Sequence, residues 1–123
     1  MLMYYDAKYA GLSAYGGFFD LNTCQPSFVY CTFKAFGELY ALGSQAVIER
    51  DCDNEVYAVA ATDGERRAVM LSNISAESKE ICTDLEGAYT AYLIDRNNCL
   101  TELDLSATDF TIAPESVILL KNY

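Results

Sequence analysis

The stretch EVYAVAATDGERRAVMLSN, residues 55–73, decides the fold of this chain. Two largely apolar runs, residues 55–62 and 67–73, lie on either side of the dipeptide Asp63-Gly64. Asp-Gly between two such runs is typical of a β-hairpin, because glycine accepts the positive φ that a tight turn requires. The stretch therefore predicts two neighbouring antiparallel strands.

Short apolar runs of the same kind continue on both sides of this hairpin, separated by turn-forming residues. The separators are Asp63-Gly64, Glu86-Gly87, Asn97-Asn98 and Pro114-Glu115. We predict strands over residues 46–49, 55–62, 67–73, 78–83, 89–94, 100–105, 110–112 and 117–121. About eight short strands at this spacing predict a mainly β fold, an antiparallel sandwich in preference to a barrel.

Residues 25–43, QPSFVYCTFKAFGELYALG, have the periodicity of a helix. Pro26 suits the first helical turn and Gly43 suits the C-terminal cap. Apolar side chains fall on two adjoining stripes, one with Phe28, Thr32, Ala35, Leu39 and Leu42, the other with Val29, Phe33, Phe36 and Tyr40. We predict a helix over residues 26–42 whose wide apolar arc is buried on more than one side. The change of pattern divides the chain into residues 1–45 and residues 46–123.

Charge and composition exclude several classes of function. The net charge is −10, from 18 acidic and 8 basic residues, so nucleic acid and anionic membrane surfaces are poor partners. No stretch approaches the roughly 18 apolar residues that span a membrane. The absence of histidine removes Ser-His-Asp and Cys-His catalysis and the commonest transition-metal ligand. We expect no metal and no cofactor.

The chain has five cysteines, and no two of them form a CxxC pair: Cys24, Cys31, Cys52, Cys82 and Cys99. Single cysteines among apolar neighbours are usually small buried core residues. We therefore expect free thiols in a reducing, cytoplasmic compartment, with a disulfide framework as the alternative.

Three polar motifs have ordinary structural interpretations. The acidic run ERDCDNE, residues 49–55, offers oxygen ligands for a cation such as calcium, but a solvated turn explains it as well. Asn73-Ile74-Ser75 fits the N-glycosylation pattern, which we interpret as a coincidence. Carboxylates at the hairpin ends, where polar residues are expected anyway, include Asp63, Glu65, Asp84, Glu86 and Asp95.

Aromatic residues crowd the start of the chain, interleaved with Gly11, Gly16 and Gly17; they are Tyr4, Tyr5, Tyr9, Tyr15, Phe18 and Phe19. Aromatic faces beside a flexible backbone form platforms for sugar rings, and Asp6 and Asp20 would bind hydroxyl groups there. The alternative is that most of these aromatics belong to a core.

The order of these segments resembles that of a known family. YYDA at Tyr4 to Ala7 ends an apolar run, GGFFD at Gly16 to Asp20 follows, and FKAFGELYALG at Phe33 to Gly43 comes next. This order is similar to the C-terminal part of clan A glycoside hydrolases, particularly the β-xylosidase-like enzymes of family 39. The end of their sandwich resembles IAPESVILLK, Ile112 to Lys121.

The resemblance implies that residues 1–45 are the last strand, loop and helix of a (β/α)8 barrel and that residues 46–123 are a C-terminal β-sandwich. Tyr4, Tyr5 and Asp6, with Tyr15 and Phe18 of the loop, would then border a sugar site, because barrel active sites lie at the C-terminal ends of the strands. The two catalytic glutamates of such enzymes would lie upstream of Met1. This sequence therefore departs from the family at its catalytic centre.

These observations predict a non-catalytic sandwich region of a glycoside hydrolase that acts on plant-type polysaccharide. Its role would be to brace the barrel. The helix either packs on the sandwich or, through exposed apolar surface, binds the barrel domain or a second copy of the chain. Two other functions stay open: an independent carbohydrate-binding module that uses the aromatic loop, and an acidic interaction domain without a carbohydrate ligand.

Overall fold

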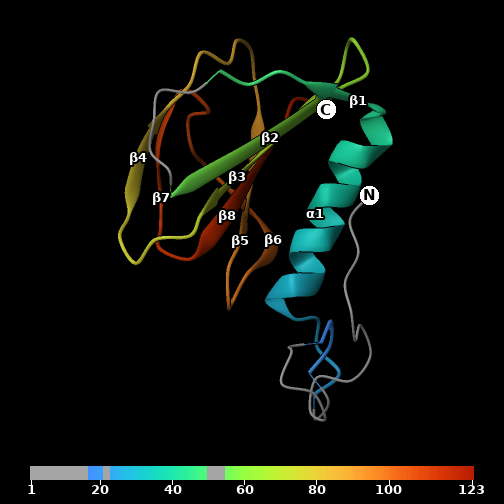
Figure 1. The fold of residues 1–123 in the computed structure, drawn as a ribbon, viewed down its shortest axis with the longest axis vertical. Coiled ribbons are helices and arrows are strands. Elements are labelled where there is room, and N and C mark those ends of the chain that lie inside the picture. The colour runs from blue at the N-terminus through green and yellow to red at the C-terminus, as the bar shows by residue number, and fades with distance from the viewer. Residues whose placement is uncertain (1–16, 21–22, 50–54) are drawn as a thin grey trace.

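The computed structural model describes residues 17–20, 23–49 and 55–123. In this part of the chain one helix precedes eight strands, and the fold is mainly β, as the sequence predicts (Figure 1). The helix is α1 (Phe28–Leu42), and the strands are β1 (Ser44–Ala46), β2 (Val56–Thr62), β3 (Arg67–Asn73), β4 (Lys79–Cys82), β5 (Thr90–Ile94), β6 (Cys99–Leu103), β7 (Asp109–Ile112) and β8 (Ser116–Lys121).

The strands form two antiparallel sheets, with α1 as a third layer (Figure 1). The larger sheet has six strands in the order β1-β2-β3-β8-β5-β6, and the smaller sheet pairs β4 with β7. One hydrophobic cluster fills the space between α1 and the larger sheet, and a second lies on the opposite face, against the smaller sheet. This arrangement confirms the predicted sandwich and adds a helix to one of its outer faces.

Strand β8 lies in the middle of the larger sheet, hydrogen-bonded to β3 and β5. Its residues from Ser116 to Leu120 are all buried. Because successive side chains of a strand point to opposite faces, Val117 and Leu119 enter the cluster under α1, while Ile118 and Leu120 enter the cluster under the smaller sheet. Because both faces of this central strand are buried, its sequence from Val117 to Leu120 is an unbroken run of apolar residues.

Helix α1 begins at Phe28, two residues later than its proline suggests. Ser27 is the N-cap, and its hydroxyl oxygen accepts a hydrogen bond from the backbone N–H of Tyr30 at 3.3 Å. The predicted placement of Pro26 in the first turn is therefore wrong: Pro26 precedes the cap and forms an isolated bridge with Phe19. A serine hydroxyl can accept a hydrogen bond from a free backbone N–H of the first helical turn, whereas the side chain of proline cannot. At the other end, Gly43 adopts a left-handed φ of 84° and caps the helix as predicted.

One stripe of α1 packs on the larger sheet, which is one of the two arrangements predicted for this helix. Its buried residues are Cys31, Ala35, Leu39 and Leu42. They contact strand residues that include Ala68, Met70, Val117 and Leu119. An ion pair adds to this packing, because Lys121 Nζ of β8 donates to Glu38 Oε2 of α1 at 2.7 Å.

The predicted strand over residues 46–49 is wrong in its bounds. Strand β1 ends at Ala46, because only three of its residues pair with β2, from Ser44↔Thr62 to Ala46↔Ala60. Val47 then leaves the sheet and is 92% exposed. The other predicted strands agree with the structure to within two residues at each end.

A disulfide joins Cys31 of α1 to Cys99 of β6, with the two Cα atoms 5.3 Å apart. The prediction of free thiols is therefore wrong for this pair. Cys24 and Cys82 are free but exposed, against the expectation of buried thiols, and Cys52 lies outside the described residues. The bond closes a loop with a sequence separation of 68. In the chain-entropy model a loop of that length stabilises the fold by about 4 kcal/mol.

The β2–β3 hairpin has the turn that its sequence predicts. Gly64 has a φ of 106°, in the left-handed region. Asp63 Oδ1 accepts hydrogen bonds from the backbone N–H groups of Glu65 and Arg66, and Arg66 also forms an ion pair with Oδ2 at 2.7 Å. The backbone and side-chain hydrogen bonds from Arg66 hold the pKa of Asp63 below its usual value.

This lowered pKa predicts a pH dependence of stability. A carboxyl group with a lower pKa in the folded state contributes stability that is complete above its unfolded pKa of about 4 and is lost as the pH falls through the folded value. We expect Asp63→Asn to unfold at a lower temperature than the native chain at pH 7. The difference should shrink as the pH falls below 4, because the native carboxyl becomes protonated.

Thermal unfolding followed by circular dichroism between pH 7 and pH 2 measures this difference. Asp84→Asn, at an exposed turn position, is the control. Parallel curves for the native chain and Asp63→Asn over the whole pH range would contradict the prediction.

Asn73, at the end of β3, is a buried polar connection between the two sheets. It is 1% exposed. Its Nδ2 donates to the carbonyl oxygens of Glu77, Ile112 and Ala113 at 2.7, 3.2 and 3.0 Å. Its Oδ1 accepts from the backbone N–H and the hydroxyl of Ser75. The sequon asparagine therefore has a structural role, which supports the interpretation of the glycosylation pattern as a coincidence.

We expect Asn73→Ala to lower the free energy of unfolding by about 3 kcal/mol, since it leaves buried carbonyl groups without a donor. Urea unfolding measures the loss. Ile74→Ala, at an exposed neighbouring position, is the matched control and should change the stability by less than about 0.5 kcal/mol. Equal small losses in the two variants would show that the connection is unimportant.

Candidate binding surface

Four aromatic side chains meet at the start of α1: Phe18, Phe19, Tyr30 and Phe33, named here the aromatic cluster. The ring centroids of Phe18 and Phe33 are 5.1 Å apart, and those of Phe19 and Tyr30 are also 5.1 Å apart. Phe18 meets Tyr30 edge to face at 6.1 Å. Aromatic pairs at such distances and angles stabilise one another beyond their buried area.

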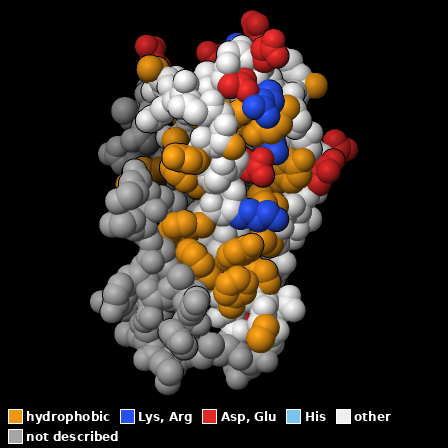
Figure 2. Space-filling model, turned by 90° about the vertical axis from the view of Figure 1, so that its right-hand side faces the viewer, with side chains coloured by type: hydrophobic (Ala, Val, Ile, Leu, Met, Phe, Trp, Pro, Cys, Tyr) orange, Lys and Arg blue, Asp and Glu red, His pale blue; other side chains and the backbone are white. Residues whose placement is uncertain are grey.

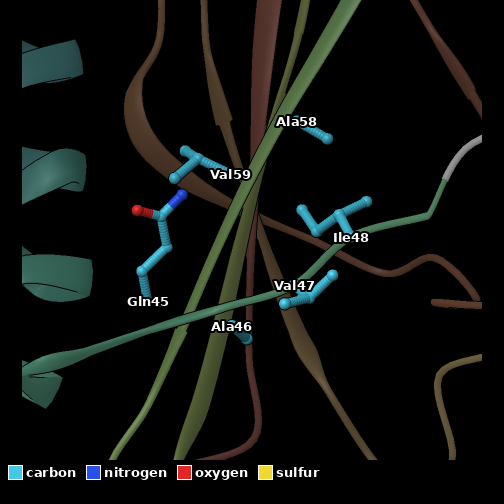
Figure 3. Close-up of a pocket in the computed structure, with 6 residues that line it drawn as sticks. All are labelled: Gln45, Ala46, Val47, Ile48, Ala58 and Val59. Carbon is cyan, nitrogen blue, oxygen red and sulfur yellow. The ribbon is translucent and has the colours of Figure 1, made fainter.

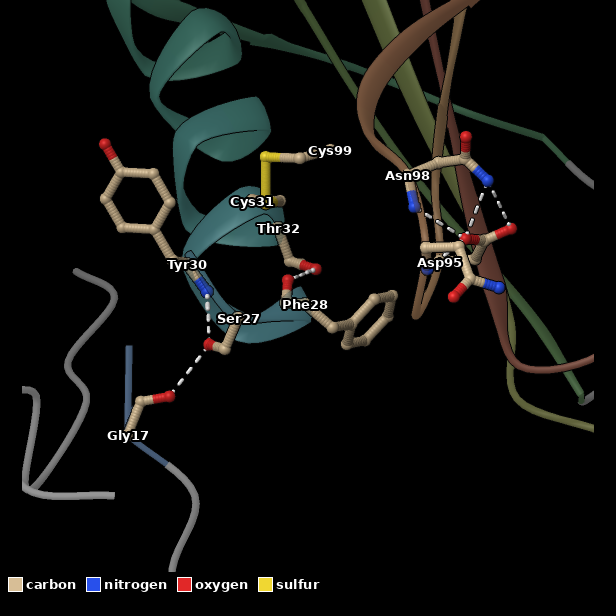
Figure 4. Close-up of a disulfide and its surroundings, with 10 residues drawn as sticks. Gly17, Ser27, Phe28, Tyr30, Cys31, Thr32, Asp95, Asn98 and Cys99 are labelled. Atoms are coloured by element: carbon tan, nitrogen blue, oxygen red, sulfur yellow. Dashed lines mark hydrogen bonds between the residues drawn. A yellow bond between two sulfur atoms is a disulfide. The ribbon is translucent and has the colours of Figure 1, made fainter. Parts of the chain in front are cut away.

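Hydrogen bonds tie the segment before α1 to the helix cap and so position this cluster. Ser27 Oγ donates to the carbonyl oxygen of Gly17 at 2.8 Å (Figure 4). The backbone N–H of Ser27 donates to the carbonyl oxygen of Phe18 at 2.7 Å. Asp20 closes a turn, because its Oδ1 accepts from the backbone N–H and the hydroxyl of Thr23. Phe18 and Phe19 are thereby held beside the first turn of α1.

Of the five residues predicted to border a sugar site, the structure describes Phe18 alone. It is half-buried within the aromatic cluster, which agrees with both the sugar-platform and the core interpretation. Tyr4, Tyr5, Asp6 and Tyr15 lie outside the described residues. The exposed member of the cluster is Phe19, with 40% of its surface accessible.

The outer side of α1 adds further apolar surface next to the aromatic cluster. Figure 2 shows hydrophobic side chains gathered on the side of the molecule where the helix lies. Tyr40 is 81% exposed, and Gly37 lies one turn before it on the same side. A Cβ atom built on Gly37 would meet nothing within 4 Å. We name the positions Val29, Phe33, Gly37 and Tyr40 the outer stripe.

Two shallow hollows lie at opposite edges of the larger sheet. The first, of about 490 Å³, is lined by Gln45, Ala46, Val47, Ile48, Ala58 and Val59. Figure 3 shows Gln45 and Val59 on the helix side of β2, and Ala58 and Ile48 on its other side. The hollow therefore wraps around the sheet edge. Its lining has no charged side chain and offers no acid–base chemistry.

The second hollow, of about 440 Å³, lies between β5 and the edge strand β6, and its lining is Tyr89, Thr90, Glu102, Leu103, Asp104 and Leu105. The hydroxyl of Tyr89 is buried without a hydrogen-bond partner among the described residues. No motif of the sequence marks Glu102 or Asp104 as functional. Polar residues that alternate along an edge strand carry no signal of a hollow beside them.

Two of the hairpin carboxylates, Asp63 and Asp95, are used within their own turns. Asp63 binds Arg66, and Asp95 Oδ1 accepts from the backbone N–H groups of Asn97 and Asn98 and from the side chain of Asn98. Burial alone would raise the pKa of Asp95, but these hydrogen bonds outweigh it and the pKa lies below its usual value. A general acid needs the opposite shift.

Two other sequence motifs give no site in the described part of the chain. Most of the acidic run, residues 50–54, lies outside the described residues. Within residues 17–20, 23–49 and 55–123, no group of cysteine, aspartate and glutamate side chains is arranged to hold a metal ion. Helix α1, the one helix of these residues, has 15 residues and is not long and apolar enough to cross a membrane.

No protein-family model and no curated protein matches the chain. Among solved structures, a glycoside hydrolase family 30 subfamily 8 xylanase from Clostridium acetobutylicum has a TM-score of 0.68 at 9% identity, over 86% of this chain and 30% of that one. A conserved exported protein from Bacteroides fragilis has a TM-score of 0.56 at 16% identity, over 63% of this chain and 18% of that one. A family 30 endoxylanase from Clostridium papyrosolvens C71 has a TM-score of 0.48 at 14% identity, over 63% and 22%.

At these identities the similarity shows the fold alone. The chain spans less than a third of the length of each of these structures. The match to the Clostridium acetobutylicum xylanase covers a larger share of this chain than the part that follows α1. Some of the segment up to the end of α1 must therefore share the xylanase fold together with the sandwich.

Proposed function

We propose that this chain is a non-catalytic β-sandwich region of a longer glycoside hydrolase that acts on xylan or a related plant polysaccharide. The observation that supports the proposal is the fold similarity to the Clostridium acetobutylicum xylanase, with a TM-score of 0.68 over 86% of this chain. The order of the YYDA, GGFFD and FKAFGELYALG segments is an independent argument from the sequence. The fold similarity and the segment order both favour the same class of enzyme.

Two finer features belong to the same proposal. The sequence resembles family 39 enzymes, whereas the Clostridium acetobutylicum xylanase of similar fold belongs to family 30. The placement at the C-terminal end of the parent enzyme, after the barrel, rests on the sequence resemblance. The catalytic glutamates would come from upstream of this chain, and the described hairpin carboxylates Asp63 and Asp95 are already engaged in turns.

The role that we propose is to brace the catalytic barrel through the outer stripe of α1. The stripe of α1 that contains Cys31 and Leu39 is buried on the sandwich, while Tyr40 of the outer stripe is 81% exposed. Glycine in the middle of a helix costs about 1 kcal/mol relative to alanine. Among the described residues nothing requires a glycine at position 37, because a Cβ atom there would have open space. A close approach by a neighbouring helix of the barrel would explain it.

This role predicts that Gly37→Leu stabilises the isolated chain but destabilises the full-length enzyme. In the isolated chain, Gly37→Leu should raise the free energy of unfolding by about 0.8 kcal/mol, because leucine is the better helix former and the site is open. In the full-length enzyme, found by following the reading frame upstream of the Met1 codon, the same change should lower the melting temperature, because the side chain would collide with the barrel.

Urea unfolding of the isolated chain and calorimetry of the full-length enzyme measure these effects. Thr111→Leu, at an exposed position of β7 on the far layer, is the control and should act alike in both contexts. Stabilisation by Gly37→Leu in both contexts would rule out docking through the outer stripe. Release of reducing sugar from xylan by the isolated chain would overturn the non-catalytic assignment.

A second candidate function is sugar binding by the aromatic cluster, favoured by the exposure of Phe19 beside Tyr30. In that case xylo-oligosaccharides should change the tyrosine fluorescence of the chain with saturation, and Phe19→Ala should weaken the affinity at least about tenfold, the loss of one stacking face. Ile74→Ala, an exposed apolar residue on the sandwich, is the control. If no sugar of a panel changes the tyrosine fluorescence, an acidic interaction domain is favoured.

A further inference from the structure

We infer that the Cys31–Cys99 disulfide is a redox-sensitive staple that holds the first half of α1 on the sandwich, and that the chain folds in an oxidising compartment. This inference is independent of the proposed function, since it concerns how the chain keeps its own helix in place. It replaces the expectation of a cytoplasmic location. Three features of the described residues support it.

The first feature is a β-bulge that turns Cys99 toward the helix. Ile94 pairs with Cys99 and Leu93 pairs with Thr101, so Leu100 is an extra residue in β6. Ile94 and Leu100 both belong to the cluster under α1. Cys99, opposite Ile94, therefore faces the same side as its neighbour Leu100, which a regular strand would not allow.

The bulge places the backbone of Leu100 in an unfavourable conformation. Leu100 has a φ of 58°, a left-handed conformation that residues with a side chain rarely adopt. Such a conformation persists only where surrounding structure determines it. The disulfide on one side and the packing of Leu100 under α1 on the other supply that structure.

The second feature is the turn that presents Cys99. Asp95 Oδ1 accepts hydrogen bonds from the backbone N–H groups of Asn97 and Asn98 at 2.7 and 2.8 Å. Asn98 Nδ2 also donates to both carboxylate oxygens of Asp95, at 2.9 and 3.0 Å. Figure 4 shows this turn beside the disulfide. Cys99 follows directly after Asn98, so the hydrogen bonds of the turn hold its backbone independently of the disulfide.

The third feature is the uneven attachment of α1. Its second half buries Ala35, Leu39 and Leu42, and the ion pair of Glu38 with Lys121 reinforces it. In the first half, before Ala35, Cys31 is the one fully buried residue, at 1% exposure. Because Tyr30 and Phe33 of the aromatic cluster lie in this first half, the disulfide also fixes the cluster to the sandwich.

The bond forms when the two thiols lose two electrons and two protons to an oxidant, such as the disulfide of a thiol–disulfide oxidoreductase, which becomes a dithiol. Cytosolic thiol systems reverse this reaction. Cys99 is exposed on the edge strand, so an external thiolate can attack there and release the thiolate of Cys31. A second thiol of the reductant then frees Cys99 and is itself oxidised to a disulfide.

Hydrogen exchange of the whole chain, read by mass spectrometry, tests the staple. Dithiothreitol followed by iodoacetamide should accelerate exchange at least tenfold in residues 28–33 and less than twofold in β8 (Ser116–Lys121). Cys99→Ser should reproduce the fast exchange without reductant. The variant with Cys24→Ser and Cys82→Ser, which lacks the two exposed free thiols, should respond to dithiothreitol as the native chain does.

The compartment is tested by making the chain in bacteria with and without an export signal and blocking thiols at lysis. Exported chain should yield the Cys31–Cys99 peptide pair and slow exchange in residues 28–33, and cytosolic chain should yield blocked thiols and fast exchange. Slow exchange in both preparations, an unlinked pair in the exported chain, or equal acceleration of residues 28–33 and β8 on reduction would each overturn the inference.

Discussion

The burial of β8 on both faces is the constraint on which the rest of the structure depends. Four consecutive residues, from Val117 to Leu120, are apolar and buried, so neither face of the strand has a polar side chain there that could be exposed to water. A strand of this kind needs neighbours at both edges and a layer on each side. Strands β3 and β5 pair with the two edges of β8. Helix α1 covers one face of the sheet, and β4 with β7 covers the other. The three-layer arrangement satisfies this demand.

Local signals explain why most of the fold could be predicted. Asp63-Gly64 determines its hairpin through contacts within four residues, and the run of β8 can be read as a central strand without knowledge of its neighbours. Two predictions failed where a distant segment decides. The end of β1 depends on how far β2 remains its partner, and Cys31 meets Cys99 only because α1 crosses the sheet.

The candidate site was less predictable than the fold for a related reason. Aromatic residues near glycines mark Phe18 and Phe19 in the sequence, but their ring contacts with Tyr30 and Phe33 require the helix cap to fold back on Gly17. The hollow beside Glu102 and Asp104 arises where an edge strand ends. Side-chain alternation describes a strand face and contains no information on where a strand stops.

The buried position of Asn73 bears on how this protein can be produced. Its Nδ2 atom, which a glycan would occupy, donates to carbonyl oxygens of three other residues inside the fold. N-linked glycans require a surface asparagine. In a eukaryotic secretory pathway the sugar is attached to the emerging chain, before β3 can pair, so glycosylation and folding would compete for the same amide. For recombinant production, bacterial export of the chain would combine disulfide formation with an unmodified Asn73.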